Sequence, residues 1–180
     1  MTGRGFLLAA LLLAAPAEAH RLDEYLQAAT IAVAPGGVEL HLRLTPGTEV
    51  ADTVIAGIDR DGDGALSQAE WAEYATQVQR DLSLTADGQP LPLRLTAARF
   101  AEVGAVKAGE AVIELDFTAD LPPANGPRIL TFENRHRDRI AIYMVNALVP
   151  RDPSVRILGQ HRSPDQSSWR LDFTIEAPGN

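Results

Sequence analysis

The feature that most constrains the fold of this chain is an alternation of apolar and polar residues that recurs along most of its length. In residues 38–44 every second side chain is that of valine or leucine, and the residues between are polar. Residues 111–118 and 169–176 repeat the alternation with other large apolar side chains. Because successive side chains of a strand point to opposite faces, this period of two predicts strands that bury one face and expose the other.

Turn-forming residues separate the expected strands. A Pro-Gly-Gly turn joins residues 26–33 to residues 38–44 as a hairpin, and an Asp-Gly pair at residues 87–88 predicts a second tight turn. Pro90 and Pro92 lack backbone N–H groups, so we expect their strand at the edge of a sheet at best. Short strands of this kind are typical of a β-sandwich. We expect strands at residues 26–33, 38–44, 82–85, 91–95, 111–118, 128–133, 140–147, 155–158 and 169–176.

The period of the pattern changes in the stretch 48–80. There the apolar residues on either side of an acidic segment are spaced as on one face of a helix, with Trp71 and Tyr74 on the core side. Thr48 is the expected N-cap of the first helix. The sequence therefore predicts a mainly β (α+β) fold, in which one β-sandwich domain at residues 20–180 carries a helix-loop-helix inserted between its second and third strands. The two helices are expected at about residues 48–58 and 71–80.

The acidic segment, residues 59–70, reads DRDGDGALSQAE and holds four carboxylates and one arginine. Asp59, Asp61 and Asp63 alternate, so their side chains can turn toward one point. Gly64 permits a sharp backbone turn because it adopts positive φ at little cost. Over its whole length the segment resembles the calcium loop of the EF-hand family.

This resemblance implies Ca²⁺ as the cofactor, since Ca²⁺ takes six to eight oxygen ligands. Leu66 is expected to pack the loop against the core. Ser67 and Glu70 also form an S-x-x-E capping pattern at the start of the second helix, and we expect the metal to draw Glu70 away from the cap. The implied ligands are the side chains of Asp59, Asp61, Asp63, Ser67 and Glu70 and the main-chain carbonyl of Ala65.

The chain contains one such loop, whereas EF-hands usually occur in pairs. We therefore expect a dissociation constant near 10⁻⁴–10⁻³ M, roughly the range of extracellular modules. The alternative is an acidic, glycine-rich surface turn that binds no metal. The agreement of four acidic residues, Gly64, Leu66 and two amphipathic helices favours calcium over that alternative.

The first 19 residues predict export. Arg4 precedes a compact apolar run, and Ala17, Glu18 and Ala19 have the form of a signal-peptidase site. The run is shorter than the roughly 20 residues of a membrane-spanning helix. We expect a signal peptide at residues 1–19 and a periplasmic or secreted mature chain with no membrane span. The net charge of −8 argues against a nucleic-acid partner, because phosphates require a basic surface.

Histidines suggest a second metal chemistry. His20 would become the first residue of the mature chain, where its amine and imidazole could chelate copper together with a second histidine. His41, His136 and His161 are the candidates for that second ligand. The charged segment 133–139 is interpreted as a solvated loop, with an anionic ligand or a partner protein as the alternative.

Two classes of function remain open. In the first, the protein is not an enzyme but an exported calcium-binding module, with calcium in a structural or interaction-modulating role and a possible protein partner. In the second, it is an enzyme or a copper-handling protein whose calcium site only supports the sandwich. The sequence contains no cysteine nucleophile and no G-x-S-x-G motif, which favours the first class.

Overall fold

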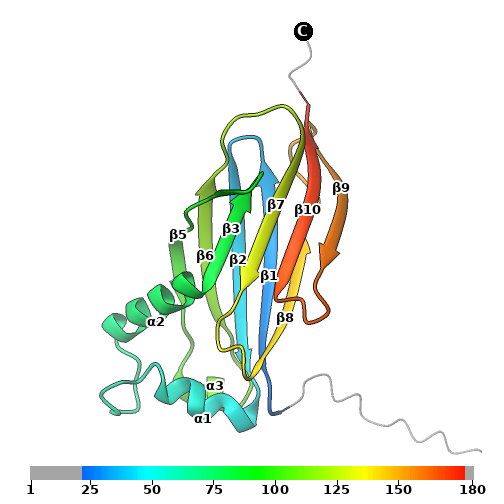
Figure 1. Cartoon of the computed structure of the whole chain (residues 1–180). Helices are drawn as coiled ribbons and strands as arrows, with labels where there is room; N and C mark the ends of the chain where they lie inside the picture. Colours follow the sequence, from blue (N-terminus) through cyan, green and yellow to red (C-terminus); the bar gives the residue numbers. More distant parts are fainter. Residues whose placement is uncertain (1–21, 177–180) are drawn as a thin grey trace, which may run out of the picture.

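The computed structural model describes residues 22–176 and is a β-sandwich of two five-stranded sheets with helices at one end (Figure 1). This confirms the predicted mainly β fold. The expected signal peptide and His20 lie outside the described residues. The strands are β1 (Tyr25–Ala34), β2 (Gly37–Pro46), β3 (Leu82–Ala86), β4 (Gln89–Pro90), β5 (Arg94–Arg99), β6 (Ile113–Asp120), β7 (Gly126–Asn134), β8 (Ala141–Ala147), β9 (Val155–Arg162) and β10 (Ser168–Ile175), and the helices are α1 (Thr48–Ala56), α2 (Gln68–Asp81) and α3 (Val103–Lys107).

The first sheet has the strand order β5-β6-β2-β1-β8, and the second has the order β4-β3-β7-β10-β9. The predicted hairpin is present, since β1 and β2 pair antiparallel and Ala34 lies opposite Gly37. β1 also pairs with β8, in parallel, so this sheet is mixed. Side chains cover the free edge of β8, because Arg162 Nε donates to the Val145 carbonyl at 2.9 Å and Gln160 Oε1 accepts from Ala147 N at 3.1 Å.

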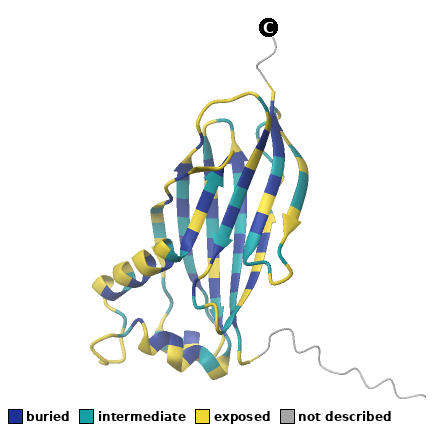
Figure 2. Ribbon diagram, in the orientation of Figure 1, coloured by how far each residue is buried: buried dark blue, intermediate teal, exposed yellow. Residues whose placement is uncertain are grey.

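The core lies between the sheets and follows the predicted alternation. Buried and exposed residues alternate along the strands as bands in Figure 2. Large side chains from both sheets fill the interior, among them Phe117 and Leu42 from the first and Trp169, Phe132 and Phe173 from the second. Full burial of each such side chain contributes roughly 1.5–3 kcal/mol.

The predicted strand at residues 91–95 is wrong in its extent. β4 ends at Pro90 in one sheet, and β5 begins at Arg94 in the other. Leu91 and Leu93 are buried in the crossing between the sheets. β4 and β5 are both edge strands. The edge position of β4 agrees with Pro90, which has no backbone N–H to donate to a ladder. The short helix α3 was not predicted from the sequence.

The helix-loop-helix lies between β2 and β3, as predicted, and the structure places it at one end of the sandwich (Figure 1). Val54, Ile58, Tyr74 and Val78 from its inner faces join the core of the sandwich, so the insert and the sheets share one core. The predicted N-cap is wrong, because the cap position is Gly47, without a side-chain bond, and Thr48 is the first helical residue. No helix within residues 22–176 has the length and apolarity to cross a membrane.

Candidate metal centre

Two glycines shape the backbone between α1 and α2. Gly62 has a φ of 73° and Gly64 a φ of 82°, a region that L side chains rarely adopt. A Cβ at either position would meet no atom within 4 Å, so conformation rather than space requires glycine there. The turn predicted at Gly64 is therefore confirmed, and the loop contains a second one at Gly62.

The three aspartates of the loop accept hydrogen bonds from backbone N–H groups of the same loop. The carboxylate of Asp59 accepts from the Gly62 N–H at 2.8 Å and from the Gly64 N–H at 3.0 Å. Asp61 and Asp63 each accept a hydrogen bond from the backbone N–H two residues further along, at 3.2 and 2.8 Å. These bonds curl the chain so that its side chains turn inward.

The carboxylates of Asp59, Asp61 and Asp63 converge. One oxygen from each lies within 4.8 Å of the others, although Asp61 and Asp63 are exposed. With Ca²⁺–oxygen bonds of 2.3–2.6 Å, two oxygens on opposite sides of one ion are separated by about 4.6–5.2 Å. The three oxygens are therefore close enough together to contact one metal ion, and their spacing is compatible with the size of Ca²⁺.

Glu70 lies at the start of α2 and serves as a helix cap. Its carboxylate accepts from Ser67 N at 2.9 Å, from Ser67 Oγ at 2.7 Å and from Arg60 N at 2.7 Å. Ser67 Oγ in turn accepts from Glu70 N at 3.3 Å, which completes the predicted capping box. These bonds, first the one from the Ser67 hydroxyl, lower the pKa of Glu70 to about 2, so the group is a carboxylate at neutral pH.

The structure thus brings together three of the six predicted ligand residues. Ser67 and Glu70 pair with each other at the helix cap, and Ala65 follows Asp63 in the loop with its N–H bonded to that residue. For Glu70 to bind a metal with both oxygens, it would have to exchange these cap bonds for the ion. Metal binding by the loop would therefore change the hydrogen bonds of the first turn of α2.

Three contacts hold the loop and the start of α2 in place. Leu66 packs against the core, which confirms the expectation for that position. Arg60 forms an ion pair with Glu73 on α2. Trp71 stacks on Phe100 with ring centroids 5.3 Å apart and planes within 5°, so the start of α2 lies against the chain that follows β5.

Behind α2 lies a buried series of hydrogen-bonded polar side chains, the buried polar chain, which the sequence did not predict. The hydroxyls of Tyr25 and Tyr74 are 2.6 Å apart, and Tyr74 Oη lies 2.9 Å from His136 Nε2. His136 Nδ1 lies 2.7 Å from Asp81 Oδ2 at the end of α2. The interpretation of residues 133–139 as a solvated loop is wrong, because Asn134 and His136 are buried. Strand β1, helix α2 and the segment after β7 meet through this chain.

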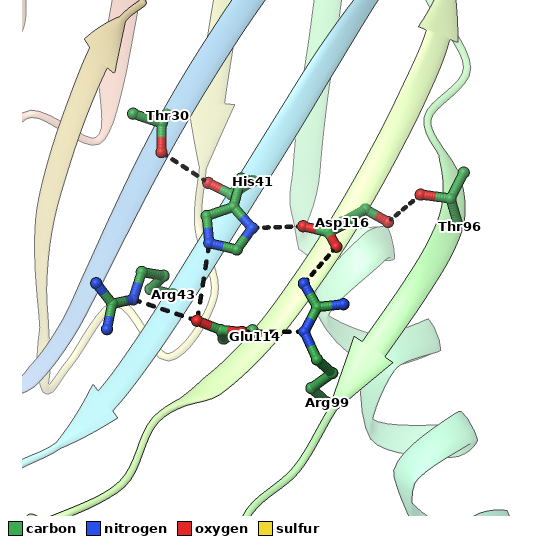
Figure 3. Close-up of polar contacts among 7 residues, drawn as sticks. All are labelled: Thr30, His41, Arg43, Thr96, Arg99, Glu114 and Asp116. Carbon is green, nitrogen blue, oxygen red and sulfur yellow. Dashed lines mark hydrogen bonds and ion pairs between the residues drawn. The ribbon is translucent and has the colours of Figure 1, made fainter.

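The histidines of residues 22–176 lie in separate polar contacts. His136 belongs to the buried chain, and His161 bonds Asp172 at 3.0 Å. His41 contacts Asp116 on the outer face of the first sheet, within a network that includes Arg99 (Figure 3). Each histidine has a different aspartate partner, so the structure does not gather them into one copper site.

Comparisons with protein-family models, with curated proteins and with solved structures found no match to this chain. A fold by itself does not fix a function, which depends on the geometry and chemistry of the site.

Proposed function

We propose that this protein binds one Ca²⁺ through residues 59–70 in the manner of an EF-hand. The observation that supports this most is the convergence of one carboxylate oxygen each from Asp59, Asp61 and Asp63 within 4.8 Å. Three like charges this close repel one another, and a divalent cation offsets that repulsion. The Ala65 carbonyl, Ser67 and Glu70 complete the proposed ligand set.

Calcium acts in this proposal as a clamp between the two helices. α1 and α2 both contribute side chains to the sandwich core, which limits how far either helix moves. When the Glu70 carboxylate leaves the cap and binds the ion, the ion connects the start of the loop to the start of α2. Ser67 Oγ still accepts from Glu70 N in that arrangement, so α2 keeps half of its capping box. We infer a stabilising, non-enzymatic calcium module of an exported protein.

The test is thermal unfolding with and without 10 mM Ca²⁺ at constant ionic strength. For a dissociation constant of 10⁻⁴–10⁻³ M, bound calcium adds about 1.4–2.7 kcal/mol to the free energy of unfolding. At roughly 2–4 °C per kcal/mol for a chain of this size, the melting temperature rises by about 3–11 °C. Calorimetric titration should report one site. The same concentration of Mg²⁺ should give a smaller shift, because Mg²⁺ demands a tight octahedron and retains waters.

Asp59→Asn and Glu70→Gln each remove one charge from the proposed ligands and should abolish most of the calcium shift. Glutamine is accepted at this position of a capping box, so Glu70→Gln spares the helix start. Asp52→Asn on α1 is the matched control, since it removes the same charge from an exposed residue that pairs with Lys107 outside the loop. An unchanged melting temperature in the wild type, or a full response in both loop variants, would refute the proposal.

A further inference from the structure

A basic groove lies beside the calcium loop, between the end of α1 and the outer side of α2. Its volume is about 1000 Å³. Residues from three separate parts of the chain line it, including Gly57, Arg60, Glu73, Thr76, Arg80 and Arg137. Three arginines face one glutamate in this groove, whereas the whole chain has a net charge of −8. The groove is therefore a local concentration of positive charge on an acidic protein.

Gly57 makes room for one of these arginines. Its backbone is right-handed helical, with φ −79° and ψ −14°, a conformation open to any residue. A Cβ at this position would overlap Nη2 of Arg137. A larger residue would therefore displace the end of the Arg137 side chain, whose guanidinium lies against the backbone at the end of α1.

The guanidinium groups of Arg137 and Arg80 form no ion pair among residues 22–176, although Arg137 lies close enough to Tyr74 and His136 to affect their pKa values. Nε of Arg137 is buried and has no hydrogen-bond acceptor. Arg60, by contrast, is paired with Glu73. A buried donor without an acceptor costs stability, and because Nε is closed to solvent, a ligand oxygen would meet the part of the Arg137 guanidinium that borders the groove.

We propose that this groove is a binding site for a small oxyanion, with Arg137 and Arg80 as its principal contacts. Guanidinium groups present planar pairs of N–H donors that match the oxygens of phosphate and carboxylate groups. The guanidinium of Arg137 lies against Gly57 and its Nε is buried, so less side-chain freedom is lost on binding than for a fully exposed arginine. Glu73 lies in the same groove, where its negative charge repels an anion. Its ion pair with Arg60 leaves that arginine less available to the ligand.

The test is made without calcium, in buffer passed over a chelating resin, because Arg60 belongs to both the groove and the proposed calcium loop. The probes are inorganic phosphate and acetate at constant ionic strength, each followed by calorimetry and by the amide resonances of Gly57 and Thr76. We expect saturable binding of at least one probe at millimolar concentration, with shifts at both amides. Stronger binding of phosphate assigns the site to phosphate groups, and stronger binding of acetate assigns it to carboxylates.

Three variants separate a binding role from a structural one. Arg80→Gln changes an exposed residue and should weaken binding about tenfold or more, the effect of losing a charge-assisted hydrogen bond. Arg137→Gln should do the same. Glu73→Gln should tighten binding roughly two- to fivefold, because it removes the opposing charge and frees Arg60. A residue that only stabilises the fold would not produce this gain.

Arg135→Gln is the control, since Arg135 is exposed, pairs with Glu133 and lies outside the groove. Its affinity should equal that of the wild type. The proposal is overturned if neither probe gives saturable binding in the wild type. It is also overturned if Arg80→Gln and Arg135→Gln bind equally well, or if Glu73→Gln binds more weakly. Because calcium is absent throughout, none of these results bears on the calcium site.

Discussion

Substitution of Tyr74 by phenylalanine should destabilise this protein far more than the same substitution at Tyr25, although both hydroxyls are buried. The reason is the direction of the hydrogen bonds. Burial lowers the pKa of His136 despite the opposing effect of Asp81, so the imidazole is neutral at neutral pH. Its Nδ1–H donates to Asp81, and Nε2 accepts from Tyr74. The oxygen of Tyr74 is then free to accept from Tyr25.

Tyr74→Phe removes the middle of this chain. It leaves a donor on Tyr25 and an acceptor on His136 unpaired, and both residues are fully buried. Each unsatisfied buried group costs about 1–3 kcal/mol, so the variant should lose roughly 2–6 kcal/mol of the free energy of unfolding. Tyr25→Phe removes only the end of the chain. Tyr74 still donates to His136, so the loss should be about 0.5–1.5 kcal/mol.

Urea denaturation at neutral pH measures these losses. The double variant Tyr25→Phe/Tyr74→Phe should lose less than the sum of the single variants, because the donor stranded by Tyr74→Phe is then absent. Tyr143→Phe is the control, since its hydroxyl donates a longer, 3.2 Å bond to the His136 carbonyl. A Tyr74→Phe variant no less stable than Tyr25→Phe, or strictly additive losses, would refute this hydrogen-bond assignment.

Two further predictions concern pH and the helix cap. The lowered pKa of His136 means that, below the ordinary value of about 6.5, the unfolded chain binds a proton that the folded chain does not. The free energy of unfolding should therefore fall as the pH drops below about 6.5, and His136→Gln, unlike His161→Gln, should lose this dependence in urea titrations at several pH values. Ser67→Ala removes the side-chain cap of α2 and should cost the calcium-free protein about 1 kcal/mol by urea denaturation. Ser83→Ala, at an exposed position of β3, should cost close to nothing, and equal losses in the two variants would contradict the capping role.

The features that the sequence predicted well depend on residues close together in the chain. The Asp59 carboxylate bonds N–H groups three and five residues away, and the Ser67–Glu70 capping box spans three. Such contacts follow from local conformation, so the residue pattern carries them. The alternation in β2 predicts its buried face for the same reason, since a strand exposes every second side chain to the same side.

The features that the sequence did not predict depend on pairing between distant segments. Tyr25 and Tyr74 are 49 residues apart, and Gln27 and Asn134, which bond at 2.9 Å beside them, are 107 apart. His136 lies in a charged segment that reads as solvated until α2 and β1 cover it. No local pattern distinguishes a buried histidine from an exposed one, because burial is set by what packs against it.

The sequence alone determined the strand-rich character of the chain, the helix-loop-helix between its second and third strands, and the acidic loop at residues 59–70. Tertiary structure decided how β4 and β5 divide between the two sheets, which charged residues are buried, and that Arg80 and Arg137 border one groove beside that loop. The physical reason is the distance along the sequence over which each property is determined. Backbone conformation and side-chain period are local properties of a segment, whereas strand order, burial and the convergence of charges arise only when segments remote in the sequence pack against one another.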